Sequence, residues 1–165
     1  MSNTLVVFYS LDGNSKLIGE EIKNILNCDI LELKPIKDLN PNSFKLSKYL
    51  WGGKQIIMNK APELNPYTID LKKYDNLFIG SPIWAGTYAP ALKTFFIENE
   101  IKDKNIGLYC CHGGGSSKGI FANFEKELNP NNEILGKIEF QDPLTLSKDD
   151  SKLKLHQWVN SLKLR

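Results

Sequence analysis

The chain has 165 residues, of which 41% are apolar and 24% are charged, and its formal net charge is +2. This length suits one compact domain with a sizeable core, so we expect a single domain over residues 1–165. The small charge and the scattered lysines argue against a nucleic-acid-binding surface, and no apolar run approaches the roughly 18 residues of a membrane span.

The start of the chain and its cysteines indicate the compartment. Residues 1–4 show no charged segment followed by an apolar one, so no secretory signal is expected. The three cysteines, two of them adjacent, form neither a disulfide framework nor a metal-ligand spacing. We therefore expect a cytoplasmic protein with reduced thiols, no bound metal and no membrane partner.

The first elements have the clearest patterns. Residues 5–9 (LVVFY) form an unbroken apolar, β-prone run, which predicts a strand buried on both faces. Apolar residues then recur at helical spacing from Leu17 to Leu26, which predicts an amphipathic helix. Residues 29–33 (DILEL) alternate between apolar and polar, which predicts the second strand.

The alternation of strands and helices continues to the end of the chain. A helical pattern over residues 43–58, interrupted at Gly52 and Gly53, predicts a helix, and irregular residues 60–74 predict a surface connection. Further strands are predicted at 77–80, 106–111 and 134–140, and further helices at 89–97, 119–128 and 147–164. Five strands alternating with helices indicate a three-layer α/β fold, with a parallel sheet covered on both faces.

Ligands of such folds bind beyond the carboxyl ends of the strands. This rule directs attention to three loops rich in glycine and small polar residues, namely residues 10–15, 81–88 and 112–118. None of them carries the glycine pattern of a dinucleotide-binding turn or the Gly-Lys-Ser/Thr order of a Walker loop. The chain also lacks the strand-end aspartate of a receiver domain, a first-loop cysteine and a G-x-S-x-G nucleophile turn.

Residues 10–15 (SLDGNS) instead suit an anion-binding loop that has no cation. Successive backbone N–H groups at the start of a helix attract an anion, and the hydroxyls of Ser10 and Ser15 add donors. Gly13 permits a turn that residues with side chains avoid, and Asn14 tolerates left-handed dihedrals. Ordinary helix capping by Ser15 or Asn14 is the alternative interpretation.

Two stretches resemble the flavodoxin family. Residues 9–16 (YSLDGNSK) are similar to its phosphate loop, Ser/Thr-x-Thr-Gly-Asn-Thr, with Asp12 in place of a threonine. Residues 80–96 (GSPIWAGTYAPALKTFF) are similar to its flavin-contacting loop and the helix that follows. The resemblance implies a flavodoxin-like fold with strand order 2-1-3-4-5. It also implies FMN held non-covalently, with its phosphate in the first loop.

The resemblance further implies which residues contact the flavin. Trp84 resembles the aromatic residue that stacks on the isoalloxazine ring, and the third loop resembles the segment that bonds the pyrimidine end, where His112 either lies beside the ring or faces solvent. Many flavodoxins place a tyrosine in that loop; here Trp51 is the candidate cover for the outer face, with core packing as its alternative. The implied cofactor-binding residues are Ser10, Leu11, Asp12, Gly13, Asn14, Ser15, Pro82, Ile83, Trp84, Ala85, Gly86, Thr87, Cys111, His112, Gly113, Gly114 and Gly115.

Two functions remain open for an FMN-binding chain. An electron carrier needs an exposed flavin edge and a redox partner protein, whereas a reductase takes hydride from NAD(P)H and reduces a quinone or similar planar acceptor. The slightly basic charge favours the reductase, because carrier flavodoxins are usually acidic. The absence of a second dinucleotide motif, with arginine only at Arg165, favours the carrier, which is our expectation. A module that has lost its ligand is the third possibility, and the intact loops argue against it.

Overall fold

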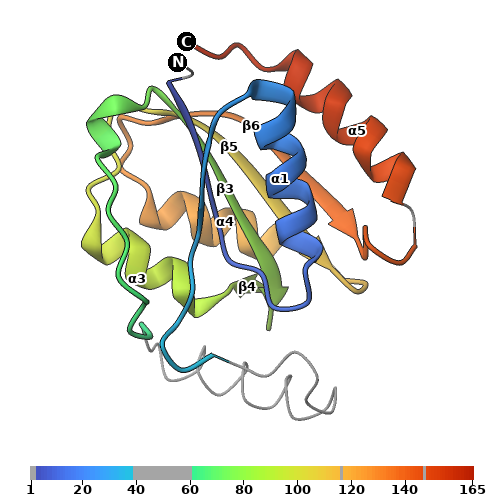
Figure 1. Ribbon diagram of the computed structural model, residues 1–165, viewed down its shortest axis with the longest axis horizontal. Coiled ribbons are helices and arrows are strands. Elements are labelled where there is room, and N and C mark those ends of the chain that lie inside the picture. The colour runs from blue at the N-terminus through green and yellow to red at the C-terminus, as the bar shows by residue number, and fades with distance from the viewer. Residues whose placement is uncertain (1–2, 39–60, 116, 147) are drawn as a thin grey trace.

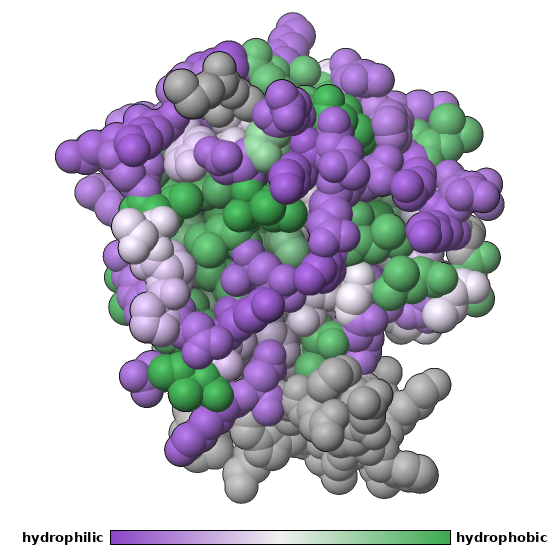
Figure 2. Space-filling model, in the orientation of Figure 1, coloured by the Kyte–Doolittle hydropathy of each residue, from purple (hydrophilic) through white to green (hydrophobic). Residues whose placement is uncertain are grey.

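The structure is a computed structural model that describes residues 3–38, 61–115, 117–146 and 148–165. The predicted helix over 43–58, with Trp51, lies outside these residues. No helix among them is long and apolar enough to cross a membrane, and Figure 2 shows a face of mainly hydrophilic residues with smaller hydrophobic areas between them. The elements are β1 (Thr4–Phe8), α1 (Asn14–Leu26), β2 (Asp29–Glu32), η1 (Leu71–Lys73), β3 (Asn76–Trp84), β4 (Thr87–Tyr88), α3 (Pro90–Glu98), β5 (Asn105–His112), α4 (Lys118–Glu127), β6 (Glu133–Gln141) and α5 (Lys148–Ser161).

The sheet has the order β2-β1-β3-β5-β6, and the short β4 pairs with β3 outside this path. All four pairings along the path are parallel, and β4 runs antiparallel to β3. Counting the five long strands in chain order, the predicted order 2-1-3-4-5 is confirmed. Because β1, β3 and β5 are neighbours in parallel, the three predicted loops leave the sheet at the same edge.

Helices cover both faces of the sheet, as predicted, with α1 and α5 on one side and α3 and α4 on the other (Figure 1). Alternate residues of a strand point to opposite faces, so β1 contributes to two apolar clusters. Val6 and Phe8 pack with α1 and α5, whereas Leu5 and Val7 pack with α3 and α4. Both clusters are fully desolvated at these positions, which explains why the strand sequence is apolar without alternation.

The structure differs from the prediction over residues 81–88, where a loop was expected. Strand β3 continues to Trp84, turns at Ala85 and Gly86, and returns as β4. The serine, proline and glycine of this segment indicated a loop, but Ser81 and Pro82 still pair with β5. The end of β3 then pairs with β4. The second loop is therefore a β-hairpin that projects beyond the edge of the sheet.

Candidate functional site

The first loop connects β1 to α1 with a glycine in the left-handed region. Gly13 has φ 89° and precedes the helix without any side-chain cap, so the capping alternative does not apply. Asn14 Oδ1 accepts a hydrogen bond from the backbone N–H of Leu144 at 3.1 Å. Its Nδ2 hydrogens therefore remain on the side of the amide away from Leu144, where they can serve a ligand.

Two hydroxyls of this loop are buried. Ser10 Oγ makes no hydrogen bond within the described part of the chain, whereas Ser15 Oγ, which meets no strict hydrogen-bond geometry, lies close enough to the Cys111 thiol to lower its pKa. Buried polar groups are almost always hydrogen-bonded, so the unpaired Ser10 hydroxyl indicates that its partner is a ligand. Together with the N–H groups at the start of α1, which have no partner within the helix, these hydroxyls suit an anion such as a phosphate.

Three ionisable side chains lie in or near the first loop, namely Lys16, Asp12 and Cys111. Lys16 Nζ bonds Glu32 Oε2 at 3.1 Å, and this contact raises the pKa of Lys16. Asp12 is exposed, so its carboxylate does not have to face an anion in the loop. Burial raises the pKa of the Cys111 thiol to about 12, against the lowering effect of the nearby Ser15 side chain, so the thiol is neutral and unreactive.

The second loop is a tight turn between paired strands. Trp84 pairs with Thr87, and the two residues between them have positive φ, 47° at Ala85 and 80° at Gly86. Positive φ at both central residues characterises the type I′ turn that two-residue hairpins favour. Ala85 and Gly86 are exposed at the tip, and Trp84 is half-buried at its base.

Tyr9 packs against the ring of Trp84. The two rings meet edge to face, with centroids 5.5 Å apart and an interplanar angle of 84°. Tyr9 is buried, and its hydroxyl donates to Asp38 Oδ1 at 2.7 Å. Burial, and then Asp38, raise the pKa of Tyr9 well above its ordinary value, so the phenol keeps its proton. Tyr9 was not among the predicted site residues, because it reads as the last residue of an apolar strand.

The third loop follows β5 and contains a histidine with a defined tautomer. The backbone N–H of Gly114 donates to His112 Nδ1 at 3.2 Å. In the neutral ring the proton is then on Nε2, which is buried and has no partner in the described residues. Gly113, Gly114 and Gly115 are exposed and add no side chain over this part of the site.

A fourth loop, residues 142–146 after β6, joins the first and third loops, and the sequence analysis missed it. The N–H of Asp142 donates to the carbonyl of His112 at 2.9 Å, while the N–H of Leu144 bonds Asn14. The Leu144 side chain also lies so close to Gly13 that a Cβ there would sit 3.1 Å from Leu144 Cδ1. The rule that ligands bind beyond strand carboxyl ends could have identified this loop.

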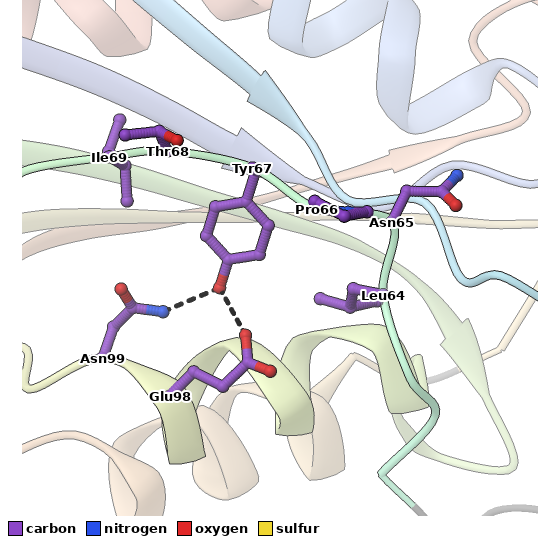
Figure 3. A pocket seen from close by; sticks show the side chains of 8 residues that line it. All are labelled: Leu64, Asn65, Pro66, Tyr67, Thr68, Ile69, Glu98 and Asn99. Atoms are coloured by element: carbon purple, nitrogen blue, oxygen red, sulfur yellow. Dashed lines mark hydrogen bonds between the residues drawn. The ribbon is translucent and has the colours of Figure 1, made fainter.

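A cavity of about 430 Å³ lies elsewhere, between residues 64–69 and the end of α3. Three of its polar side chains bond one another: Tyr67 donates to Glu98 at 2.8 Å, and Asn99 donates to Tyr67 at 2.8 Å (Figure 3). It contains none of the predicted site residues.

The four loops together suit non-covalent binding of a flat ligand that carries an anion. The first loop presents unpaired hydroxyl and amide donors, the hairpin presents an aromatic ring, and the third loop presents a ring N–H and flexible glycines. Comparison with known families agrees with this arrangement. A family model described as Flavodoxin matches residues 3–162, whereas no curated protein matches the chain.

Solved structures of similar fold cover nearly the whole chain. A flavoprotein from Lactobacillus acidophilus NCFM, crystallised in complex with FMN, has 23% identity and a TM-score of 0.73, and the match covers 96% of this chain and 99% of that one. A protein of Bacteroides eggerthii named as a flavoprotein has 18% identity and a TM-score of 0.79, with 100% of both chains covered. An NADH:FMN oxidoreductase in its apo form has 15% identity and a TM-score of 0.55, covering 98% and 91%. At these identities the similarity is one of fold.

Proposed function

Because the chain belongs to the flavodoxin family, we propose that it binds FMN non-covalently and transfers electrons through it to a partner protein. The flavin supplies the redox chemistry when bound, and the protein supplies binding and electrostatics. The observation that carries the proposal is the buried, unpaired hydroxyl of Ser10 in the loop where Gly13 is left-handed. The FMN-bound flavoprotein of similar fold supports the choice of ligand.

Each loop has a distinct role in this proposal. In the first loop, the hydroxyls of Ser10 and Ser15, the Asn14 amide and the backbone N–H groups of Leu11, Asp12 and Gly13 hold the phosphate. In the hairpin, Trp84 contacts the isoalloxazine ring, and Pro82, Ile83, Ala85, Gly86 and Thr87 border it. In the third loop, Cys111, His112 and the three glycines would line the pyrimidine end, where His112 Nε2 would serve as a donor.

The test compares FMN with riboflavin, which lacks the phosphate. Hydrogen bonds to a charged acceptor are worth roughly 1.5–3 kcal/mol each, so the first loop should favour FMN by well over tenfold. The purified protein is titrated with each flavin while flavin fluorescence is followed. Equal affinities would show that the first loop does not bind the phosphate, and failure to bind either flavin would overturn the proposal.

The second candidate is an FMN-dependent reductase that takes hydride from NAD(P)H. Exposed Gly113, Gly114 and Gly115 favour it, because a loop without side chains leaves room for a planar substrate. The formal charge of +2 favours it as well, since steering to a basic partner calls for an acidic carrier. Anaerobic mixing of the FMN-loaded protein with excess NADH, then NADPH, distinguishes the two. Rapid bleaching of the flavin absorbance would support the reductase, and no response to either nucleotide would support the carrier.

A further inference from the structure

Helix α4 lies along the second loop in a regular register. Gly119, Asn123 and Glu127 are spaced four residues apart, which places them on one face of the helix. Each of them contacts one of three consecutive residues, 86–88, in the same order. Each of residues 86–88 of the hairpin that presents Trp84 therefore contacts one residue of α4.

The contact at Gly119 is between backbones. A Cβ added to Gly119 would lie 2.5 Å from the carbonyl oxygen of Gly86, closer than real Cβ atoms approach any atom. Glycine is unfavourable inside a helix relative to alanine, and Gly119 is exposed, so neither helix formation nor core packing explains it. The approach of the Gly86 carbonyl to the first turn of α4 does.

The other two contacts are side-chain hydrogen bonds. Asn123 Nδ2 donates to Thr87 Oγ1 at 2.9 Å, and the Tyr88 hydroxyl donates to Glu127 Oε1 at 2.7 Å. Burial, followed by Glu127, raises the pKa of Tyr88 above its ordinary value, so this hydroxyl remains a donor. The hairpin is thus attached to α4 by one backbone contact and two side-chain hydrogen bonds.

The turn needs external support because of its backbone conformation. Ala85 has φ 47°, a left-handed value that residues with a Cβ rarely adopt. Such conformations persist where the surrounding structure imposes them. The contacts from α4 reach the residues directly after Ala85. They are therefore in a position to hold Ala85 in its left-handed conformation.

We propose that Gly119 and Asn123 are positioning residues that set where the Trp84–Thr87 turn stands at the ligand edge of the sheet. The inference rests on the proposed function, because the turn borders the isoalloxazine ring only if FMN binds there. Neither residue contacts the flavin in this scheme. Both act through Gly86 and Thr87. They affect the binding of the isoalloxazine ring but not the binding of the phosphate.

The experiment separates the ring from the phosphate by titrating variants with both FMN and riboflavin. Gly119→Ala should weaken the binding of both flavins by about tenfold, within the range that aromatic stacking contributes, and leave the ratio of the two affinities unchanged. It should also shift the reduction potential of bound FMN. Asn123→Ala should change both properties in the same direction and by less. Thermal unfolding of the ligand-free variants serves to check that they fold.

Ala122→Gly is the matched control, because it alters the exposed face of α4 with the reverse exchange. It should lower the thermal stability and retain the wild-type affinities and potential. Wild-type affinities and potential in both Gly119→Ala and Asn123→Ala would overturn the inference alone, as would a changed ratio of FMN to riboflavin affinity. A wild-type protein that binds neither flavin would overturn the proposed function, and the inference with it.

Discussion

The side-chain oxygen of Asn14 accepts a hydrogen bond at 3.1 Å from the backbone N–H of Leu144, which is 130 residues further along the chain. This bond orients the amide, because an oxygen that accepts from Leu144 leaves the two Nδ2 hydrogens on the other branch of the group. It also connects the first loop to the fourth. The donor side of Asn14 is therefore set before any ligand arrives.

Replacing Asn14 by aspartate tests that orientation. Asn14→Asp keeps an oxygen for Leu144 but loses both N–H donors and adds a negative charge beside the proposed phosphate. We expect FMN binding to weaken by about 1.5–3 kcal/mol or more, with riboflavin binding nearly unchanged, in fluorescence titrations. Asn24→Asp adds the same charge on an exposed position of α1 and should leave FMN binding near wild type. An equal loss of both flavins would place Asn14 away from the phosphate.

The buried hydroxyls lead to a prediction with opposite signs for stability and binding. Removing a buried hydroxyl that has no partner costs no hydrogen bond. We therefore expect Ser10→Ala to leave the thermal stability of the ligand-free protein unchanged or raised, and Ser15→Ala, which also loses the contact with the Cys111 thiol, to change it little. Each should weaken FMN binding by about 1.5–3 kcal/mol, because a donor to the charged phosphate is lost.

Ser81→Ala is the contrasting control for these two variants. Ser81 is fully buried, and its Oγ accepts from the N–H of Ala89 and donates to the carbonyl of Pro82, both at 2.8 Å. Its removal should lower the stability of the ligand-free protein by about 1–3 kcal/mol. If Ser10→Ala or Ser15→Ala destabilises the ligand-free protein as much, the hydroxyl has a structural role instead.

The fold was predictable because its signals are local. The apolar run of β1, the helical spacing in α1 and the alternation in β2 each lie within one segment, and their order specifies the parallel sheet. The hairpin at 81–88 was missed because serine, proline and glycine are as common in loops as at the projecting end of a strand. Nothing in the local pattern shows that Trp84 pairs with Thr87.

The candidate site was predictable where a motif encodes it and not where tertiary contacts build it. The first loop and Trp84 belong to recognisable stretches. The contacts of Asn14 with Leu144, Tyr9 with Asp38, and α4 with the hairpin join residues that are far apart in sequence and carry no motif. Each depends on which elements the completed fold places side by side.

Trp84 meets Tyr9 edge to face and packs against the core cluster, but it is only half-buried. If it stacks on the flavin, FMN should quench tryptophan emission, and Trp84→Ala should weaken both flavins by about 1–3 kcal/mol. Trp158 packs against Phe78 on the opposite face of the sheet, so Trp158→Phe should retain the quenching. Unchanged affinity in Trp84→Ala would show that the indole does not contact the ring.

The last prediction concerns Glu21, a residue of α1 that is bonded to α5. Its carboxylate bonds Lys152 Nζ at 2.7 Å and His156 Nε2 at 3.0 Å. The hydrogen bond from Lys152, followed by that from His156, holds the pKa of Glu21 below its ordinary value. A carboxyl group with a lowered folded pKa stabilises the protein above the unfolded pKa, and this stabilisation is lost as the pH falls through the folded value.

We therefore expect Glu21→Gln to lower the free energy of unfolding at pH 7. The effect should stay below about 1 kcal/mol, because Lys152 and His156 are each more than a third exposed and solvent screens the pairs. The difference from wild type should shrink as the pH falls below the ordinary carboxyl value of about 4.3. Urea denaturation at pH 7, 5 and 3 measures it, with Glu20→Gln, an exposed neighbour on α1, as the control. A loss of the same size at all three pH values would mean that the packing of the Glu21 side chain, rather than its charge, joins the two helices.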